Sequence, residues 1–393
     1  MPFRRTGRAA VTGVTAAAVL AGLSLTGGAD AVADAAGGLV RVDQVGYADG
    51  AAKEAFLLAG SPVSGARWRL VDGRGRAVAA GRTATSLGRW NAAYPAVYPI
   101  DFSRVRTPGG YRLVVDGAAA SPLVTIGPSA AVFARPAADA TRFFQAQRDG
   151  ADPVPGQLGR GPAHLNDAKA AVYDPPAYTD PDGDTVEAAP GKAGGTVDVS
   201  GGWFDAGDYL KFTETTSYAV AALQIAALRT GAGPASALGA EAQHGLEWLD
   251  RMWDGTTRTL YIQVGLGSGT EDGSVVGDHD VWRLPEKDDT DRAHPFLRNR
   301  PVFRAAAPGS RISPNQAGRL AADFALAAQR YAATGRAADR ARAQGYLATA
   351  AQIYGLADTG PGQLVTTVPY GYYPETSWQD DLAFGGAELA LAA

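Results

Sequence analysis

The pattern of hydrophobic and polar positions changes near Pro136. Between residues 38 and 127, apolar residues occur in short runs that turn residues separate, which is typical of strands rather than of long helices. We expect turns at Asp72 and Gly73 and at residues 108–110. The expected strands lie at residues 39–42, 55–58, 68–71, 98–102 and 111–115. Short strands at this spacing predict a β-sandwich of about 90 residues.

After Pro136, apolar residues recur at helical spacing. Two stripes stand out, one of Ala242, Leu246, Leu249 and Trp253 and one of Ala317, Leu320, Phe324, Ala327 and Tyr331. We expect further helices at residues 136–148, 216–229 and 336–354. Because helix follows helix with no signal of a parallel sheet, the second domain is predicted to be all-α.

The start of the helix with the second stripe is well marked. Ser313 can cap it, Pro314 suits its first position, and Gln316 completes a capping box. Stretches rich in Gly, Pro and Asp at residues 150–202 and 265–309 interrupt the helical region. We interpret them as loops that build a cleft at one end of the helical array.

Composition narrows the class of protein. A chain of 393 residues is longer than one core usually serves, which favours two domains. Apolar residues make up 46% and charged residues 19%, and the formal net charge is -4, so no basic excess points to nucleic acid or to an anionic membrane. There is no cysteine, which excludes disulfides, thiolate nucleophiles and Cys-ligated metals.

The first 35 residues have the pattern of a secretory signal peptide. Arg4, Arg5 and Arg8 precede an uncharged stretch at residues 9–25, and the small residues after it allow cleavage after Ala31, Ala33 or Ala35. Polar residues dilute the stretch too much for a membrane span. We expect a secreted, extracellular protein with no membrane association after cleavage. Whether the arginine pair marks a twin-arginine route stays open.

The strongest chemical signal is the run SGGWFDAGDYLKF at residues 200–212. Asp205 and Asp208 lie three residues apart with Ala and Gly between them, so a tight turn can bring both carboxyls to one point. Close carboxyls raise each other's proton affinity unless donors hold one ionised, and such a pair can tune a general base. The alternative is a calcium-binding or solvated acidic turn.

Aromatic residues favour the catalytic interpretation. Trp203, Phe204 and Tyr209 frame the carboxyls, and a sugar site requires aromatic faces beside acidic groups. The run resembles the signature Gly-Gly-Trp-Tyr-Asp-Ala-Gly-Asp of family 9 glycoside hydrolases, with Phe204 in place of tyrosine. The resemblance implies that Asp208 is the general base, that Asp205 helps to hold the attacking water, and that the three aromatic residues belong to the substrate site.

The run GDHDVWRLPE at residues 277–286 is a second cluster. A lone histidine in a loop is more often structural, and Asp-His-Asp can also be read as a metal site. The resemblance implies instead that His279 and Trp282, three residues apart, line the glycone side of the cleft. Arg283 and Glu286 fit a surface ion pair as well as they fit a role in the site. We therefore do not assign them to the site.

The run PETSWQDDL at residues 374–382 predicts a helix start, with Ser377 as the cap and Asp380 and Asp381 in the first turn. It also resembles the family segment Ser-Gly-Tyr-Gln-Asp-Glu-Leu, which holds a structural calcium. The resemblance therefore implies Thr376, Ser377, Asp380 and Asp381 as calcium ligands. We expect no cofactor to be required for the chemistry itself.

Other aromatic residues divide between core and cleft. Trp253 ends an apolar stripe and is predicted to lie in the core. Tyr370, Tyr372 and Tyr373 lie in a loop with Gly and Pro, where exposure to a ligand is expected. Of these, we assign Tyr372 to substrate binding.

The strand region also resembles a known module. The runs VDQVGY (42–47), IDFS (100–103) and TPGGYRL (107–113) resemble the immunoglobulin-like module that precedes many family 9 catalytic domains. The implied fold is an immunoglobulin-like β-sandwich at residues 36–128 and an (α/α)6-barrel catalytic domain at residues 129–393, incomplete at its C-terminus. The implied activity is inverting hydrolysis of β-1,4-glucosidic bonds in cellulose or related β-glucans, and we expect a monomer.

The resemblance places the catalytic acid, a glutamate, after residue 393. We therefore expect residues 36–393 alone to release negligible sugar, and stripe residues such as Leu320, Phe324 and Tyr331 to be exposed. If this part is active, Glu375 or Glu286 is the candidate acid.

Two other functions fit the same residues. One is an exo-β-glucosaminidase-type hydrolase on the same scaffold, which turnover of chitobiose-derived substrates would distinguish. The other is an inactive carbohydrate-binding remnant, which would retain polysaccharide without releasing reducing ends.

Overall fold

The computed structural model describes residues 37–63, 65–180 and 183–393. The chain divides into two compact units, Met1–Ala134 and Arg135–Ala393. The expected signal peptide, residues 1–35, lies outside the described residues. Within the described ranges, no helix is both long enough and apolar enough to cross a bilayer.

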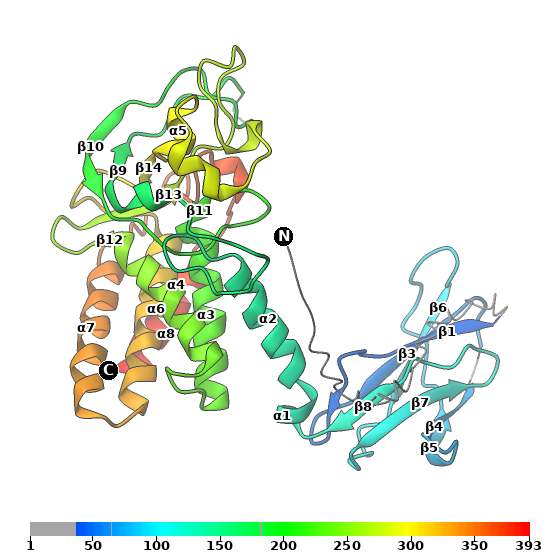
Figure 1. Cartoon of the computed structure of the whole chain (residues 1–393). Coiled ribbons are helices and arrows are strands. Elements are labelled where there is room, and N and C mark those ends of the chain that lie inside the picture. Colours follow the sequence, from blue (N-terminus) through cyan, green and yellow to red (C-terminus); the bar gives the residue numbers. More distant parts are fainter. Residues whose placement is uncertain (1–36, 64, 181–182) are drawn as a thin grey trace, which may run out of the picture. The chain divides into compact units, whose positions relative to one another are not determined.

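The first unit contains two β-sheets (Figure 1). One sheet has the order β1-β3-β6 and the other β2-β8-β7-β4-β5. Side chains that alternate along the strands, such as Ala55, Leu57 and Ala59 of β3, are buried in the core of the unit. The strands are β1 (Gly38–Arg41), β2 (Tyr47–Ala48), β3 (Glu54–Ala59), β4 (Arg67–Asp72), β5 (Ala77–Arg82), β6 (Ala96–Asp101), β7 (Gly109–Val115) and β8 (Val124–Gly127).

All five expected strands are confirmed, and β2, β5 and β8 are additional. The turn at Asp72 is confirmed as well, because its Oδ1 atom accepts hydrogen bonds from the backbone N–H groups of Arg74 and Arg76. The turn expected at residues 108–110 is displaced, since Gly109 and Gly110 already belong to β7.

The second unit contains an array of helices (Figure 1). The helix α6 packs against α3, α7 and α8, and α3 also packs against α4. Every helix expected from periodicity is present within a few residues of its predicted bounds. The α-helices of the chain are α1 (Ser129–Val132), α2 (Ala134–Ala146), α3 (Thr213–Thr230), α4 (Ala237–Arg251), α5 (Pro295–Arg298), α6 (Pro314–Ala333), α7 (Ala337–Tyr354) and α8 (Gln379–Ala392).

The second stripe is buried, contrary to the expectation that it is exposed. Leu320 and Phe324 are 0% exposed and Tyr331 is 3% exposed. The reason is that α6 has neighbouring helices on several sides within this unit.

The predicted capping box of α6 does not form. Ser313 is the N-cap residue, but its side chain makes no capping hydrogen bond. Its hydroxyl instead donates to Asn315 Oδ1 at 2.5 Å and accepts from the Val365 N–H at 2.9 Å. The amide of Gln316 donates to the Thr366 carbonyl. Val365 and Thr366, from the segment after α7, together with the nearby Asn315, take the place of the predicted capping bonds.

The prediction that the second unit is all-α is wrong, because this unit also contains a β-sheet. Its sheet has the strand order β10-β9-β14-β13-β11, and β12 pairs with β13. Three of these strands, β9, β10 and β14, lie in the stretches 150–202 and 265–309 that are interpreted above as loops. The strands are β9 (Ala170–Tyr173), β10 (Lys192–Val197), β11 (Lys211–Phe212), β12 (Trp253–Asp254), β13 (Thr259–Val264) and β14 (Val302–Arg304), and the 3-10 helices are η1 (Leu165–Lys169), η2 (Asp278–Asp280), η3 (Pro285–Thr290) and η4 (Tyr370–Tyr372).

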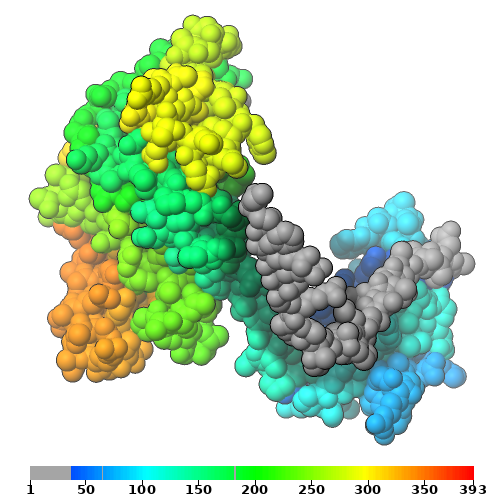
Figure 2. Space-filling view, in the orientation of Figure 1, coloured from blue at the N-terminus to red at the C-terminus, as the bar shows by residue number. Residues whose placement is uncertain are grey.

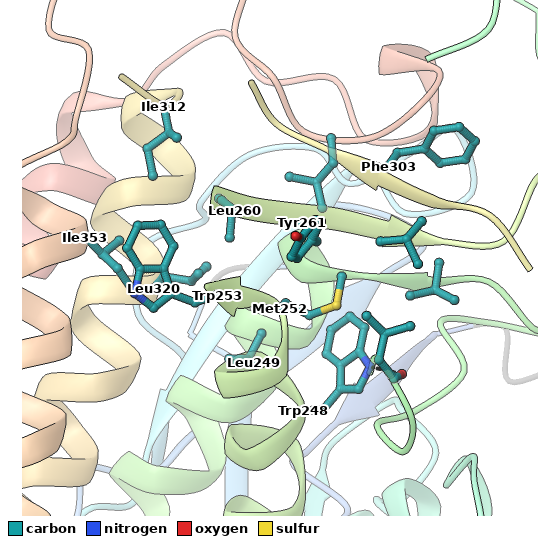
Figure 3. Close-up of a cluster of buried hydrophobic side chains, with 14 of the residues drawn as sticks. Trp248, Leu249, Met252, Trp253, Leu260, Tyr261, Phe303, Ile312, Leu320 and Ile353 are labelled. Carbon is teal, nitrogen blue, oxygen red and sulfur yellow. Dashed lines mark hydrogen bonds between the residues drawn. The ribbon is translucent and has the colours of Figure 1, made fainter. Parts of the chain in front are cut away.

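The main core of the second unit joins the helices to this sheet (Figure 3). Trp248 and Leu249 of α4 meet Leu260 and Tyr261 of β13 there, and Trp253 is buried as predicted. On the surface, the yellow segments around residue 300 lie at one end of this unit, and the orange α7 lies toward the other (Figure 2).

We predict that Leu320→Ala lowers the free energy of unfolding of the second unit by about 2–5 kcal/mol, because it leaves a cavity beneath α6. Urea unfolding followed by far-ultraviolet circular dichroism measures this change. Leu391→Ala is the matched control, because Leu391 is 71% exposed and its loss is expected to cost under about 0.5 kcal/mol. Equal effects of the two substitutions would contradict the packing described for α6.

Candidate active site

The loop that carries Asp205 and Asp208 makes a tight turn between buried residues. Gly202 has a positive φ of 80°, and a Cβ atom there would lie 2.6 Å from the Trp248 ring, so only glycine fits. The backbone N–H of Asp205 donates to the Leu210 carbonyl at 2.9 Å. This bond closes the loop around Asp208.

Two buried cations hold the two ends of this loop. Lys211 Nζ donates to the carbonyl of Gly201 at 2.7 Å. The guanidinium of Arg300 donates to the carbonyl of Tyr209. Both cations are almost fully buried. A charge-assisted bond at each end therefore restricts the positions that the two aspartates can take.

Buried aspartates balance these cations. Asp149 pairs with Lys211 at 2.9 Å and with Arg300 at 2.5 Å, and Asp167 pairs with the same two side chains. Burial raises the pKa of Asp149, but the charges of Lys211, His164 and Arg300 outweigh burial and hold that pKa well below its usual range. The carboxylates remain ionised and the network remains charged.

The network continues through His164 and Asp288 to Arg283. The imidazole of His164 lies between Asp149 at 2.8 Å and Asp288 at 3.0 Å. Arg283 donates to Asp288 at 2.6 and 2.7 Å and to Asp278 at 2.7 Å. Asp278 in turn accepts from the backbone N–H of Tyr209 at 2.6 Å. The run 277–286 is thereby attached to the aspartate loop.

Asp205 accepts hydrogen bonds on both carboxyl oxygens. Thr215 Oγ1 donates to Oδ1, and the hydroxyl of Tyr373 donates to Oδ2. Burial raises the pKa of Asp205, against the lowering effect of these two bonds. The carboxyl of Asp205 is therefore held in one orientation beside Asp208.

Asp208 belongs to a chain of three side chains. His279 Nε2 lies 2.9 Å from Asp208 Oδ2, and His279 Nδ1 lies 2.8 Å from Asp184 Oδ2. Because both ring nitrogens face carboxylate oxygens, both carry protons and the ring is an imidazolium. The bond to Asp208, with the further bond to Asp184, raises the pKa of His279 to about 9 although burial lowers it.

Asp184 receives three donors on one oxygen. Ser268 Oγ, His279 Nδ1 and the Tyr372 hydroxyl lie 2.8, 2.8 and 2.9 Å from its Oδ2 atom. Burial raises the pKa of Asp184, but these donors outweigh burial and lower it overall. The Asp184 carboxylate thus anchors His279 and Tyr372 on the same side of the site.

An open depression of about 450 Å³ adjoins Asp208. Tyr209, His279 and Trp282 are among its lining residues. Trp282 is 96% exposed, and its face is free for a ligand. Tyr209 is partly buried, with its hydroxyl on the Arg283 carbonyl and its ring under the Arg283 guanidinium. The structure brings together Asp205, Asp208, Tyr209, His279, Trp282 and Tyr372.

Two predicted substrate residues lie in the core instead. Trp203 is 3% exposed and donates its Nε1 hydrogen to Glu241 at 2.8 Å. Phe204 is 4% exposed and packs on Tyr209 and His164. Neither ring presents a face to a ligand, so the prediction that these two rings contact substrate is wrong for this structure. Both rings instead pack in the core next to the loop that carries Asp205 and Asp208.

Three of the four predicted calcium ligands are exposed, and the fourth, Asp381, is bonded to a cation. Ser377 Oγ donates to Asp380 at 3.0 Å, and Thr376, Ser377 and Asp380 are exposed. Asp381 is buried and accepts from Arg319 Nε at 2.6 Å, although its Oδ2 atom has no partner among the described residues. Two unit charges roughly 4 Å apart repel by about 4 kcal/mol at an effective dielectric constant of about 20. A cation bound by Asp381 would meet this repulsion from Arg319.

Across residues 37–63, 65–180 and 183–393, no group of three His, Cys, Asp or Glu side chains is arranged to hold a metal ion. In the same region, α8 starts later than predicted. Its N-cap residue is Trp378 rather than Ser377, although Asp380 and Asp381 lie in its first turn as expected.

The suggested ion pair between Arg283 and Glu286 is absent. Arg283 pairs with Asp278 and Asp288, whereas Glu286 pairs with Arg160 at 3.2 Å and accepts from the Gly161 N–H at 2.9 Å. Burial raises the pKa of Glu286, but these partners lower it overall. Arg283 is therefore part of the support of the site, which the sequence interpretation missed.

Sequence reasoning also missed Asp184, Thr215 and His164. Thr215 lies at the start of α3, shortly after the run at residues 200–212, and this closeness to the signature was a usable signal. Asp184 and His164 lie in a long stretch without periodicity or motif. No local pattern distinguishes them from neighbouring polar residues.

The fold and the paired carboxyls beside an aromatic-lined depression are those of a glycoside hydrolase. The chain belongs to glycosyl hydrolase family 9, whose model matches residues 133–393. Residues 35–120 match the cellulase N-terminal ig-like domain. These matches confirm the family and the immunoglobulin-like module that the sequence motifs had indicated.

Individual relatives agree with this assignment. Endoglucanase C of Cellulomonas fimi is 36% identical over 197 residues, which are 47% of this chain and 16% of that protein. Endoglucanase 20 of Oryza sativa subsp. japonica is 30% identical over 201 residues, 50% of this chain and 34% of that protein. The crystal structure of a metagenome-derived family 9 endoglucanase has a TM-score of 0.60 at 25% identity and covers 90% of this chain. The chain covers 61% of that structure.

We predict that Lys211→Met lowers the free energy of unfolding by about 3–5 kcal/mol, because it leaves buried carboxylates short of a cation. Chemical denaturation measures the change. Lys287→Met is the control, since Lys287 is exposed and its charge serves no buried partner in the described structure. A loss for Lys211→Met no greater than that for the control would show that the buried network does not hold the loop.

The raised pKa of His279 predicts a pH dependence of stability. Its folded-state pKa of about 9 exceeds the ordinary value of 6.5, so its contribution is complete below about pH 6.5 and disappears as the pH rises through about 9. The free energy of unfolding, measured between about pH 6 and pH 10, should fall more steeply for the parent protein than for His279→Gln. Parallel curves would mean that His279 carries no extra proton in the folded state.

Proposed function

We propose that this protein hydrolyses β-1,4-glucosidic bonds of cellulose or a related β-glucan with inversion at the anomeric carbon. One observation carries the proposal. Asp208 has one oxygen on His279, while its Oδ1 atom is shielded from solvent and has no hydrogen-bond partner in the described structure. A buried acceptor without a partner needs an explanation, and the attacking water is the one that the family assignment supplies.

In this proposal Asp208 is the general base. It removes a proton from a water molecule, which attacks the anomeric carbon from the face opposite the leaving group. His279 fixes the orientation of the carboxylate through Oδ2 and leaves Oδ1 for the water. Asp205, held by Thr215 and Tyr373, orients the same water.

The proposed substrate surface is the depression beside these carboxyls. The exposed ring of Trp282 offers an apolar face for a pyranose ring, and His279 and Asp208 offer polar groups for its hydroxyls. Tyr372 packs against His279 with 5.6 Å between ring centroids and extends this surface. The names of the similar endoglucanases support a β-glucan as the polymer.

The reaction also needs an acid whose carboxyl lies about 6.5–9.5 Å from that of the base. The proposal assigns none among the described residues. Asp205 is bonded to two hydroxyls, Glu286 pairs with Arg160, and Glu375 pairs with Arg319. Glu286 and Glu375 are thus occupied as structural anions.

The wider proposal follows the resemblance. The helical array is part of an (α/α)6 barrel, the protein is exported, and it acts as a monomer on a polysaccharide outside the cell. Hydrolysis by two carboxyls and water requires no cofactor.

In a protein that also carries the catalytic acid, we predict that Asp208→Asn lowers kcat on soluble β-1,4-glucan by about 10²–10⁴-fold while glucan binding stays nearly unchanged, because only base catalysis is lost. Reducing-sugar release and affinity electrophoresis measure the two quantities. Asp272→Asn is the control, since Asp272 lies in an exposed turn bonded to Thr270 and Ser274. Retention of more than about a tenth of the parent rate would remove Asp208 from the role of base.

The same assays separate the other functions. Nuclear magnetic resonance of the first product should show the α-anomer if the reaction inverts. Turnover confined to chitobiose-derived substrates would support the β-glucosaminidase-type alternative instead. Retention of glucan without release of sugar by the parent protein would support the carbohydrate-binding alternative.

A further inference from the structure

Arg319 joins three carboxyls from three parts of the second unit. It lies in α6, and its Nε atom is 2.6 Å from Asp381 Oδ1 in the first turn of α8. Its two terminal nitrogens donate to Glu214, in the first turn of α3, and to Glu375. Each nitrogen of the guanidinium thus serves a different carboxyl, and the charge is half-buried.

Close helix packing puts Arg319 in this position. A Cβ atom at Gly318 would lie 2.4 Å from the backbone of Asp381, and one at Gly385 would lie 2.5 Å from the Gly318 carbonyl. The absence of side chains at both glycines lets α6 and α8 approach at backbone distance. The following residue, Arg319, is thereby placed at the start of α8.

The junction lies directly behind Asp205. Glu214 precedes Thr215, and Glu375 lies two residues after Tyr373, which are the two donors to the Asp205 carboxyl. Asn315 Nδ2 also donates to Glu375, at 2.9 Å. The segments that present both donors to Asp205 therefore meet at one guanidinium.

We propose that the guanidinium of Arg319 supplies the positive charge where Glu214, Glu375 and Asp381 meet, in the region for which the run 374–382 predicts calcium. The folded protein therefore does not need calcium there. A guanidinium carries a permanent charge and five donors in a fixed plane, so it can serve three carboxyls at once. Calcium would need six to eight oxygen ligands around a point. The three carboxyls surround a planar fork instead.

The same geometry predicts what removal of Arg319 does. Glu214 Oε2 and Asp381 Oδ2 are buried and have no hydrogen-bond partner among the described residues. In an Arg319→Ala protein, these atoms and Glu375 become a set of oxygens around an empty volume with no positive charge. Hard cations prefer such oxygens, so the variant acquires a calcium dependence that the parent protein lacks.

Thermal unfolding with millimolar calcium and with excess EGTA tests this proposal, and it does not depend on catalysis. The Tm of the parent protein should be the same in both buffers. Arg319→Ala should unfold about 5–15 °C lower in EGTA and recover part of that loss with calcium but not with magnesium. Arg304→Ala is the matched control, because Arg304 makes one surface ion pair with Asp174, and it should show neither effect.

A parent Tm that calcium raises by several degrees would overturn the proposal, as would calorimetric titration of a stoichiometric calcium site in the parent protein. A folded Arg319→Ala protein that gains nothing from calcium would also contradict it. If Arg319→Ala does not fold, Arg319→Lys supplies one ammonium for three carboxyls and should show a smaller loss of Tm with partial rescue by calcium. The titration of the parent protein decides the question without any variant.

Discussion

The site depends on a buried set of ion pairs beneath the aspartate loop. Lys211 and Arg300 each bond one end of the loop and share Asp149 and Asp167 as counterions. Buried ion pairs are weak sources of stability, because desolvation offsets much of their attraction. Their contribution here is to fix the position of the loop, because both cations bond its carbonyl groups while their own charges are paired with Asp149 and Asp167.

Two histidines extend this arrangement in similar ways. His164 lies between two buried aspartates and connects the ion pairs to Arg283, which supports Tyr209. His279 lies between Asp184 and Asp208 at the depression and connects the loop to Tyr372. Each imidazole joins segments that are far apart in the sequence. The depression therefore has its walls fixed by charge-assisted bonds rather than by backbone pairing alone.

Much of the fold could be predicted from the sequence because its signals are local. The stripe of Leu320, Phe324 and Tyr331 marks α6, and the signature marks Asp205 and Asp208. Features that depend on distant partners could not be predicted. Ser313 bonds to Val365 instead of capping its own helix, and the strands β9, β13 and β14 form because they pair with one another across a long separation.

Burial was the least predictable property of the site residues. Trp203 and Trp282 are the same residue type in neighbouring parts of the site, yet one is in the core and the other is exposed. Glu241 decides the first case, since it accepts the indole hydrogen in the interior. No motif indicated Asp184, because its role exists only where Ser268, His279 and Tyr372 meet it.

The proposed function requires that the loop held at its ends by Lys211 and Arg300 presents Asp208, with Asp205 beside it, to a sugar in the depression. A crystal structure of the Asp208→Asn protein with a soluble β-1,4-linked gluco-oligosaccharide tests it most directly. We expect a pyranose ring against Trp282 and His279, and a water molecule within hydrogen-bond distance of both residue 205 and residue 208. An oligosaccharide bound elsewhere, or a loop whose ends have left Lys211 and Arg300, would contradict it.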